Sequence, residues 1–209
     1  KGASFVIVLD PRDKNNARLD TPMDNQSILN YGYDCSEKLY NIIQSHEDFE
    51  KLKDLPVLIT IYQATDLTES TVDGHYILKN YCDDSYGKNE QVNFETVLFT
   101  SARAKELDAT TSNEFDIIKN NLKEAATEAA GLVGTARYQD NKIQSMVIEA
   151  HLNVKTATEL MYLSSIIADG IDTRFSSEFD IKVLVYSQDE LMTVIVKDAG
   201  QDVKSSFLY

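Results

Sequence analysis

The sequence predicts an α+β fold in which antiparallel strand hairpins are covered on one side by helices. Two helical patterns, each followed by a pair of strand patterns, occupy most of the second half of the chain. The expected helices span 113–130 and 156–172, and the expected hairpins span 132–154 and 179–196. A helix–hairpin unit therefore occurs twice, which suggests a duplicated architecture although the two copies share few identical residues.

The chain is long enough to bury a large core. It has 209 residues, of which 43% are hydrophobic, and only 3 prolines, a composition typical of globular proteins. We expect one domain spanning 1–209, with two similar halves at 1–107 and 112–198 as a further possibility. No apolar run reaches the roughly 20 residues that a membrane helix needs. The chain opens close to an apolar run, which suggests a piece of a longer protein.

The net charge of −14 argues against two classes of partner. Nucleic acids are bound mainly through Lys and Arg side chains that neutralise phosphates, so a nucleic-acid partner is not expected. An anionic membrane surface would also repel the folded body. The acidic residues are spread along the chain, as in a solvated and soluble surface.

The first half is expected to combine strands with one long helix. The apolar run at 4–9 predicts a buried strand. Asp24 is suited to cap the helix that follows, and a second start signal predicts a break of this helix near His46. Alternating patterns predict strands at 57–62 and 75–81, and a returning strand at 92–102. The apolar face predicted for the helix consists of Ile28, Tyr31, Cys35, Leu39, Ile42, Ile43, His46 and Phe49.

The two helices of the second half have clear start signals. Thr111 with Glu114, and Thr156 with Glu159, match the capping box, in which each side chain bonds a free backbone N–H of the first turn. Gly131 is suited to end the first of these helices.

The strands of the second half differ in their expected exposure. The residues 140–142 predict a tight hairpin turn. In the strand that follows it, Glu149 and His151 lie on the face opposite the apolar side chains, so this face is expected to be in water. The run 191–196 is apolar nearly throughout, as in a strand covered on both faces.

The two cysteines are not arranged as metal ligands. Cys35 and Cys82 form no C-x-x-C pair, and only three histidines are present, so neither a metal site nor a cofactor is predicted. Cys35 lies on the predicted apolar helix face and is expected to be a buried thiol. A disulfide between the two cysteines is compatible with an extracellular protein.

No catalytic residue is assigned from the sequence. The nucleophile elbow G-x-S-x-G and a Gly-rich phosphate loop are both absent. A metal-dependent hydrolase using Asp10, Asp13 and His75 is an alternative, although Asp residues after a strand more often bond their own backbone in a turn.

Tyrosines and histidines are the candidate contact residues. The chain has 11 Tyr and no Trp, and exposed Tyr side chains often anchor protein or peptide contacts. The alternatives are tyrosines at the edge of the core, or a small-ligand site in a tyrosine-lined cleft between the two halves. The candidate contacts are Tyr62, His75, Tyr76, Tyr138 and His151.

Several segments together resemble the CamS family, the precursors of the sex pheromone cAM373. These segments are Leu55-Pro56-Val57, Ile59-Thr60-Ile61-Tyr62, Val72-Asp73-Gly74-His75-Tyr76, Gly134 with Tyr138-x-Asp140, Val194-Ile195-Val196-Lys197 and Ser206-Phe207-Leu208-Tyr209. The resemblance covers nearly the whole chain and corresponds to the C-terminal part of the mature family protein. The chain departs from the family at Asp73-Gly74, where the family tends to have Pro-Gly, at the less aromatic Ala129-Ala130, and in its two cysteines.

The resemblance implies a lipoprotein of Gram-positive bacteria that faces the outside of the cell membrane. Its only link to the membrane would be an N-terminal lipid anchor outside this chain, and any pheromone peptide would derive from the signal sequence. The family brings no catalytic residues. The expected function is therefore that of a non-enzymatic extracellular domain that acts through protein or peptide contacts.

Overall fold

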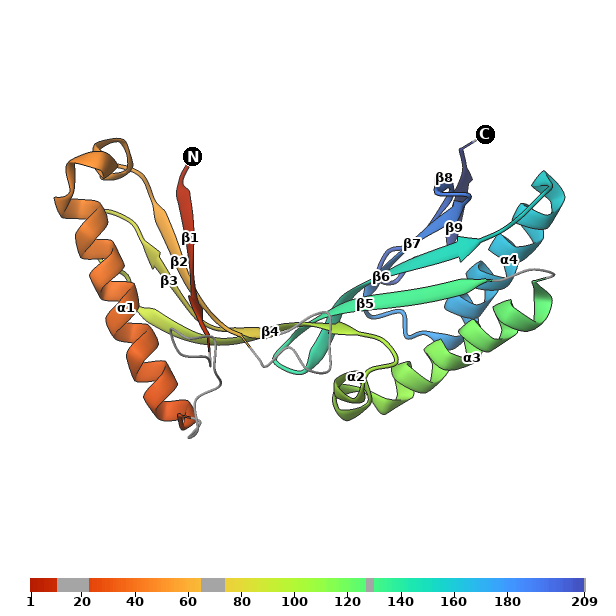
Figure 1. Ribbon diagram of the computed structural model, residues 1–209, viewed down its shortest axis with the longest axis horizontal. Coiled ribbons are helices and arrows are strands. Elements are labelled where there is room, and N and C mark those ends of the chain that lie inside the picture. Colours follow the sequence, from red (N-terminus) through yellow and green to blue (C-terminus); the bar gives the residue numbers. More distant parts are fainter. Residues whose placement is uncertain (11–22, 65–73, 127–129, 209) are drawn as a thin grey trace. The chain divides into compact units, whose positions relative to one another are not determined.

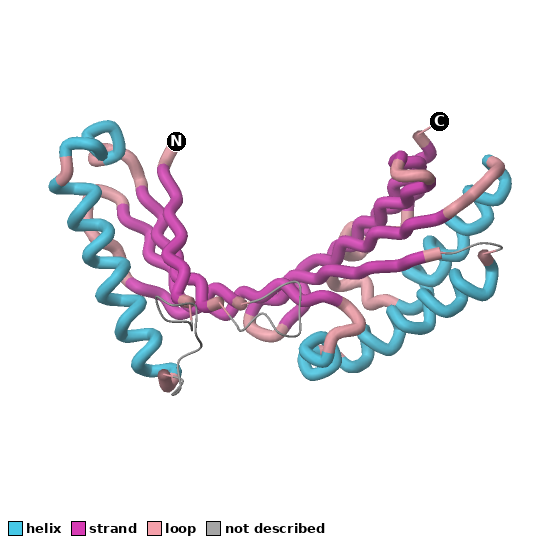
Figure 2. Tube along the Cα trace, viewed as in Figure 1, coloured by secondary structure: helices cyan, strands magenta, loops and turns pink. Residues whose placement is uncertain are grey.

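The computed structural model describes residues 1–10, 23–64, 74–126 and 130–208. Its contacts divide the chain into two compact units, Lys1–Glu95 and Thr96–Tyr209. The boundary thus falls earlier in the chain than the expected junction at 107–112. Each unit combines a sheet with one or more helices (Figures 1 and 2), and each is described by itself below.

The first unit is a sheet of strands β1 to β4 with one long helix on it. The strands lie in the order β1-β2-β3-β4, and β1 is parallel to β2 while the other pairs are antiparallel. Helix α1 packs against β1, β2 and β3. The last residues of β4 belong to the second unit. The elements are β1 Ala3–Leu9, α1 Asn25–Ser45, η1 Glu47–Leu52, β2 Val57–Gln63, β3 His75–Cys82 and β4 Asn89–Leu98.

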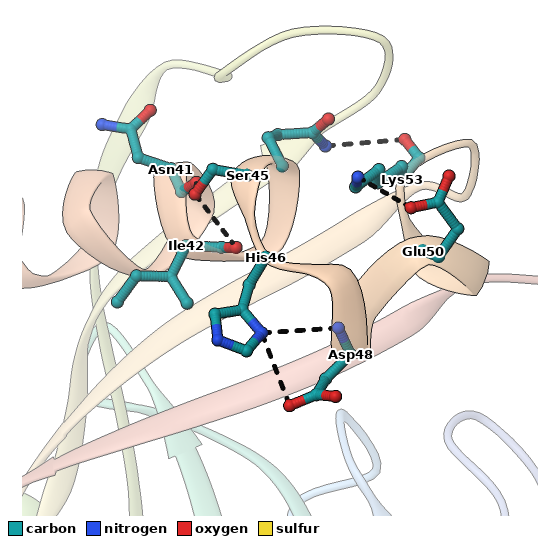
Figure 3. A network of polar contacts seen from close by, with 8 residues as sticks. Asn41, Ile42, Ser45, His46, Asp48, Glu50 and Lys53 are labelled. Carbon is teal, nitrogen blue, oxygen red and sulfur yellow. Dashed lines mark hydrogen bonds and ion pairs between the residues drawn. The ribbon is translucent and has the colours of Figure 1, made fainter.

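Both ends of α1 agree with the signals in the sequence. The Asp24 carboxylate accepts a hydrogen bond from the Ser27 backbone N–H at 2.9 Å, which confirms the predicted cap. The helix ends at Ser45, next to the predicted break. There His46 Nδ1 accepts from the Asp48 backbone N–H at 3.4 Å and starts the short 3₁₀-helix η1 (Figure 3).

The face that α1 buries agrees with the predicted one only in part. Ile43 is fully buried, and Ile28 and Leu39 pack against the core of the first unit, as predicted. The most buried residues of the helix are Gly32, Ser36 and Ile43, whereas Tyr31 and Ile42 are 54% and 49% exposed. A Cβ on Gly32 would lie only 3.5 Å from the Ile61 side chain, so the helix approaches the sheet closely through small residues. Counting apolar residues misses such a face, because Gly and Ser carry no hydrophobic signal.

Strand β1 is also less buried than its sequence predicts. Its residues alternate between half-buried and exposed, with Val6 49% and Val8 58% exposed. The prediction of a buried strand was wrong because α1 packs on one face of the sheet only. We call the face of β1–β4 that points away from α1 the open face of the first unit.

The second unit has helices on one face of a five-stranded sheet. The strands lie in the order β5-β6-β7-β8-β9, with β6 and β7 parallel and the other pairs antiparallel. Helices α3 and α4 pack against each other and cover one face (Figure 1). The predicted α+β class is confirmed. The elements are α2 Ala102–Leu107, α3 Ala109–Ala125, β5 Gly131–Gln139, β6 Lys142–Leu152, α4 Ala157–Arg174, β7 Asp180–Ser187, β8 Glu190–Lys197 and β9 Lys204–Phe207.

The helix starts of this unit match the predictions only in part. Thr156 caps α4 through the Glu159 backbone N–H at 3.1 Å, as predicted, and Glu159 accepts in turn from the Lys155 N–H. Helix α3 begins earlier than expected, because Asp108 and not Thr111 is its cap. It also ends at Ala125, so Gly131 opens β5 and does not end the helix.

Both hairpin turns have the conformation that their sequences favour. Asp140 and Asn141 have φ angles of 51° and 63°, and Gln188 and Asp189 have 51° and 66°. Two successive left-handed residues are the mark of a type I′ turn, and Asn and Asp adopt this conformation more easily than most residues. The predicted turn at 140–142 is confirmed.

Strand β8 is covered on one face only, which corrects the expectation for 191–196. Its buried positions are Thr193, Ile195 and Lys197, and Leu191 is exposed. Lys197 is 4% exposed and donates from Nζ to the backbone carbonyls of Ile171, Asp172 and Phe175 at 3.3–3.4 Å. Its ammonium group therefore binds the C-terminal end of α4.

The two units contain the same arrangement of elements. The segment β1-α1-β2-β3-β4 and the segment β6-α4-β7-β8-β9 each start with a parallel strand pair joined by a helix and continue with two antiparallel pairs. The second pair of each segment has a register shift at a tyrosine, Tyr62 in β2 and Tyr186 in β7. The two predicted helix–hairpin units, α3 with β5 and β6 and α4 with β7 and β8, are both present. The matching segments are different ones, because α4 with β7 and β8 corresponds to α1 with β2 and β3.

Candidate functional site

A row of large side chains crosses the open face of the first unit. Val8, Tyr62, Tyr76 and Phe94 lie directly opposite one another on four neighbouring strands. We call this set the first row. The rings of Tyr62 and Tyr76 meet edge to face at 5.1 Å, which is a favourable aromatic geometry. Val8 is 58%, Phe94 38% and Tyr76 36% exposed, so the row presents apolar surface to solvent.

The second unit has a corresponding row. His151, Tyr186 and Leu191 lie opposite one another on β6, β7 and β8, and we call them the second row. The His151 and Tyr186 rings are stacked at 5.3 Å with an angle of 12° between them. By the match between the segments, His151 corresponds to Val8, Tyr186 to Tyr62 and Leu191 to Tyr76. The second row thus has a histidine in place of the valine and a leucine in place of the second tyrosine.

An ion pair lies on the face of the first row, and in the second row His151 lies beside a carboxylate. Lys79 Nζ lies 2.9 Å from Glu90 Oε2, and the hydrogen bond to Lys79 holds the pKa of the Glu90 carboxyl below its usual value. In the second unit, His151 Nε2 lies 3.6 Å from Glu149 Oε2. All four side chains are about half exposed, so these pairs add specificity to a contact more than stability to the fold.

Three of the five residues predicted as contacts lie in the two rows. Tyr62 and Tyr76 belong to the first row and His151 to the second. His75 precedes Tyr76 on β3, so its side chain points to the other face of the sheet, where it is half-buried. Tyr138 is 1% exposed and packs in the core of the second unit, so it is not available to a partner.

The rows are completed by four residues that were not singled out from the sequence: Val8, Phe94, Tyr186 and Leu191. Each lies in a strand pattern, so its position on a strand was predictable. Its neighbours across the sheet depend on the pairing register, which local sequence does not determine.

The alternative enzyme chemistry gains no support from the described residues. Asp10 is exposed at the end of β1, and Asp13 lies outside the described residues. No group of three or more His, Cys, Asp or Glu side chains is placed to hold a metal ion within the described part of the chain. His46, the third histidine, caps η1. Cys35 and Cys82 are free thiols, and Cys82 is the buried one, contrary to the expectation for Cys35.

Two surface grooves lie in the second unit. One, of about 470 Å³, lies between α3 and α4. The other, of about 570 Å³, lies where α4 begins and β7 turns into β8. Neither is lined by a tyrosine. Tyr62 and Tyr76 lie on the open face of the first unit's sheet.

Comparison with protein families identifies the chain. A family described as the CamS sex pheromone cAM373 precursor matches residues 11–203. The chain belongs to the CamS family. The resemblance seen in the sequence is thereby confirmed. Comparison with curated proteins found no significant match.

Solved structures of CamS-family proteins share the fold. The C-terminal domain of the sex pheromone staph-cAM373 precursor from Staphylococcus aureus is 15% identical, with a TM-score of 0.77 over 100% of this chain and 65% of that chain. A sex pheromone precursor from Lactobacillus salivarius is 13% identical, with a TM-score of 0.79 over 99% of this chain and 62% of that chain. This CamS-family chain thus spans less than two thirds of the length of either structure. No helix in its described residues is long and apolar enough to cross a membrane.

Proposed function

We propose that this CamS-family chain is a non-enzymatic domain outside the cell that binds a protein or peptide through the first row. The observation that carries the proposal is the alignment of Val8, Tyr62, Tyr76 and Phe94 across four strands of the open face. Large aromatic side chains on a rigid sheet are typical anchors of protein contacts, because they bury much area and lose little conformational freedom on binding.

The surroundings of the row favour a contact surface over an active site. Its neighbours on the open face are side chains of the same sheet and the Lys79–Glu90 ion pair. An apolar strip with a polar rim is the usual anatomy of a protein interface. A small-molecule site is usually concave and encloses most of its ligand.

The test is a peptide selection on the 209-residue chain with matched variants. Peptides selected from a displayed random library on the wild-type protein are expected to bind Tyr76→Ser at least about tenfold more weakly, because a buried aromatic anchor contributes about 2 kcal/mol or more. The control is Tyr162→Ser, since Tyr162 is an exposed tyrosine on α4. Selected peptides that bind both variants equally well would refute a role for the first row.

The non-enzymatic and extracellular parts of the proposal have separate tests. The wild-type chain is assayed against a panel of hydrolase substrates. If it turns over any of them and Asp10→Asn does not, the domain is an enzyme and this part of the proposal is wrong. The proposed lipid anchor would lie outside this chain, in a longer protein of the CamS family that contains it. Palmitate labelling of that protein in its host is expected to give a labelled product at the outer face of the membrane, and an unlabelled product would contradict the anchor.

A further inference from the structure

No described strand pairs with the outer edge of β1. Among the described strands β1 is the first of the sheet order and pairs with β2 alone. The Ala3 N–H donates to Pro56 O at 2.9 Å, and the Leu9 carbonyl accepts from the N–H of Ala64, the residue after β2, at 3.0 Å. The Phe5 carbonyl also points toward β2, where it accepts from the Thr60 side-chain hydroxyl at 3.3 Å. The backbone N–H and C=O groups of the odd-numbered residues of β1 therefore point toward β2. The N–H and C=O groups of Ser4, Val6 and Val8 point outward, as the alternation along a parallel strand requires.

This edge lacks the features that usually prevent pairing with another strand. Edge strands are commonly protected by charges, prolines, bulges or short length. Ala3–Leu9 has seven residues, none of them charged or proline, and it pairs with β2 without a register shift. The strand β9 at the edge of the second unit has four residues and carries Lys204.

Helix α1 carries partly exposed apolar side chains on the flank away from β4. Tyr33 and Tyr40 lie toward β4, because Tyr33 bonds Gln91 and the Tyr40 ring meets that of Tyr86. At 100° per residue, Tyr31, Cys35 and Ile42 lie roughly 160° around the helix from those tyrosines, on the opposite flank. We call these three residues the α1 stripe. Tyr31 and Ile42 are about half exposed, and Cys35 is half-buried.

The second unit shows what covers the corresponding surface there. Strand β6 corresponds to β1, and its outer edge is paired along its length with the antiparallel strand β5. Helix α4 corresponds to α1 and is flanked by α3, close enough that a Cβ on Gly170 would lie 2.9 Å from the Ile118 side chain. The first unit has no counterpart of β5 or α3 among its described residues.

We propose that the β1 edge and the α1 stripe together bind an antiparallel strand of a partner protein, in the manner of β5 on β6. Its inward side chains, those opposite Phe5 and Ile7, would be apolar and would pack under the α1 stripe. Its flanks would be basic, because the first unit has 17 Asp and Glu against 9 Lys and Arg, a formal charge of −8. The same charge disfavours a second copy of the chain. This contact uses backbone groups at the sheet edge, whereas the first row uses side chains on the sheet face, and the two surfaces share only Val8.

The first test is hydrogen exchange of individual β1 amides, measured by NMR. The probe is the end-blocked peptide Lys-Lys-Val-Thr-Val-Thr-Val-Thr-Lys-Lys. In the free chain the Phe5 and Ile7 amides are expected to exchange slowly and the Val6 and Val8 amides fast. Adding the peptide is expected to slow Val6 and Val8 by at least about tenfold, because a strand added to the edge pairs with the outward groups. Unchanged exchange at saturating peptide would overturn the proposal.

Matched variants separate edge pairing from general binding. Val6→Pro removes an outward N–H and leaves the bonds to β2 in place, so the peptide is expected to bind at least about tenfold more weakly. Val6→Thr keeps the N–H and is expected to bind like wild type. Ile42→Ser on the α1 stripe is expected to weaken binding about fivefold, whereas Met161→Ser, an equally exposed position on α4, should have no effect. If the peptide binds Val6→Pro and Val6→Thr with equal affinity, the peptide does not pair with the outer edge of β1.

The remaining outcomes decide the identity of the partner. Replacing the four Lys of the peptide by Glu is expected to abolish binding at low salt, and equal binding of the two peptides would contradict the basic flanks. Sedimentation of the free chain is expected to show a monomer. A dimer that is lost in Val6→Pro would show that a second copy of the chain occupies the edge, and would overturn the proposal. Slow exchange of the Val6 and Val8 amides in the monomer without peptide would also overturn it, because the edge would then already be paired. These readouts do not depend on Tyr76, so their failure leaves the proposed function of the first row standing.

Discussion

Replacing Lys197 by methionine is expected to destabilise the second unit. The Lys197 side chain is 4% exposed and reaches from β8 to the end of α4, where Nζ donates to three backbone carbonyls. These carbonyls belong to the last turn of α4 and the residue after it. Lys197→Met keeps a long apolar side chain in the same space and removes only the charge and the donors.

The size of the effect follows from the three bonds. A hydrogen bond with a charged partner contributes a net 1.5–3 kcal/mol, and the distances of 3.3–3.4 Å place these bonds near the lower limit. Because they share one ammonium group their contributions are not additive, so we expect a loss of about 3 kcal/mol. The carboxylate of Asp172 is 3.6 Å from Nζ but half exposed, and adds little.

The assay is urea unfolding followed by NMR signals of the second unit, which separates its transition from that of the first. Lys182→Met is the control, since Lys182 is exposed on the neighbouring strand β7 and its replacement should change the unfolding free energy by less than about 0.5 kcal/mol. A neutral or stabilising Lys197→Met would refute the reasoning. It would mean that the desolvation of the buried ammonium costs as much as its hydrogen bonds contribute.

Three further substitutions test local features of the two units. Asp24→Ala should lower the urea midpoint of the first unit at pH 7. The hydrogen bonds from Ser27 lower the pKa of the Asp24 carboxyl below its usual value of 3.8, so the difference between wild type and variant should vanish as the pH falls below 3.8. Gly134→Ala should destabilise the second unit by about 1–3 kcal/mol, since the added Cβ would lie 2.7 Å from the buried Phe115 ring. Gly131→Ala should be nearly neutral, because its Cβ would come no closer than an ordinary contact of 4.0 Å to His151. Lys79→Ala should raise the pKa of Glu90 toward 4.5 in a carboxyl NMR titration, and an unchanged value would contradict the ion pair.

The features predicted correctly are those that depend on neighbouring residues along the chain. The cap at Asp24, the cap at Thr156 and the turn at 140–142 each involve groups within three residues of one another. Strand alternation in β2 and β6 was likewise visible, because one face of each strand is covered by helices. Such local preferences persist whatever the rest of the chain does.

The features predicted wrongly depend on what packs against a segment. The apolar stripe of α1 was assigned to the core, yet Gly32 and Ser36 face the sheet and Tyr31 and Ile42 do not. Tyr138 was grouped with the contact tyrosines, but its strand faces α3 and α4, so it lies in the core. Whether a side chain is buried depends on which helix or strand packs against it, and the local sequence does not show which element that is.

By itself, the sequence of this CamS-family protein determined the fold class, most strand positions and the family. Only the tertiary structure decided which side chains share a surface. The first row joins residues from four strands between Val8 and Phe94, and the β1 edge and α1 stripe are defined by the absence of a neighbouring strand among the described residues. Pairing register and sheet order arise from contacts between distant segments, and the candidate surfaces exist only once those contacts are made.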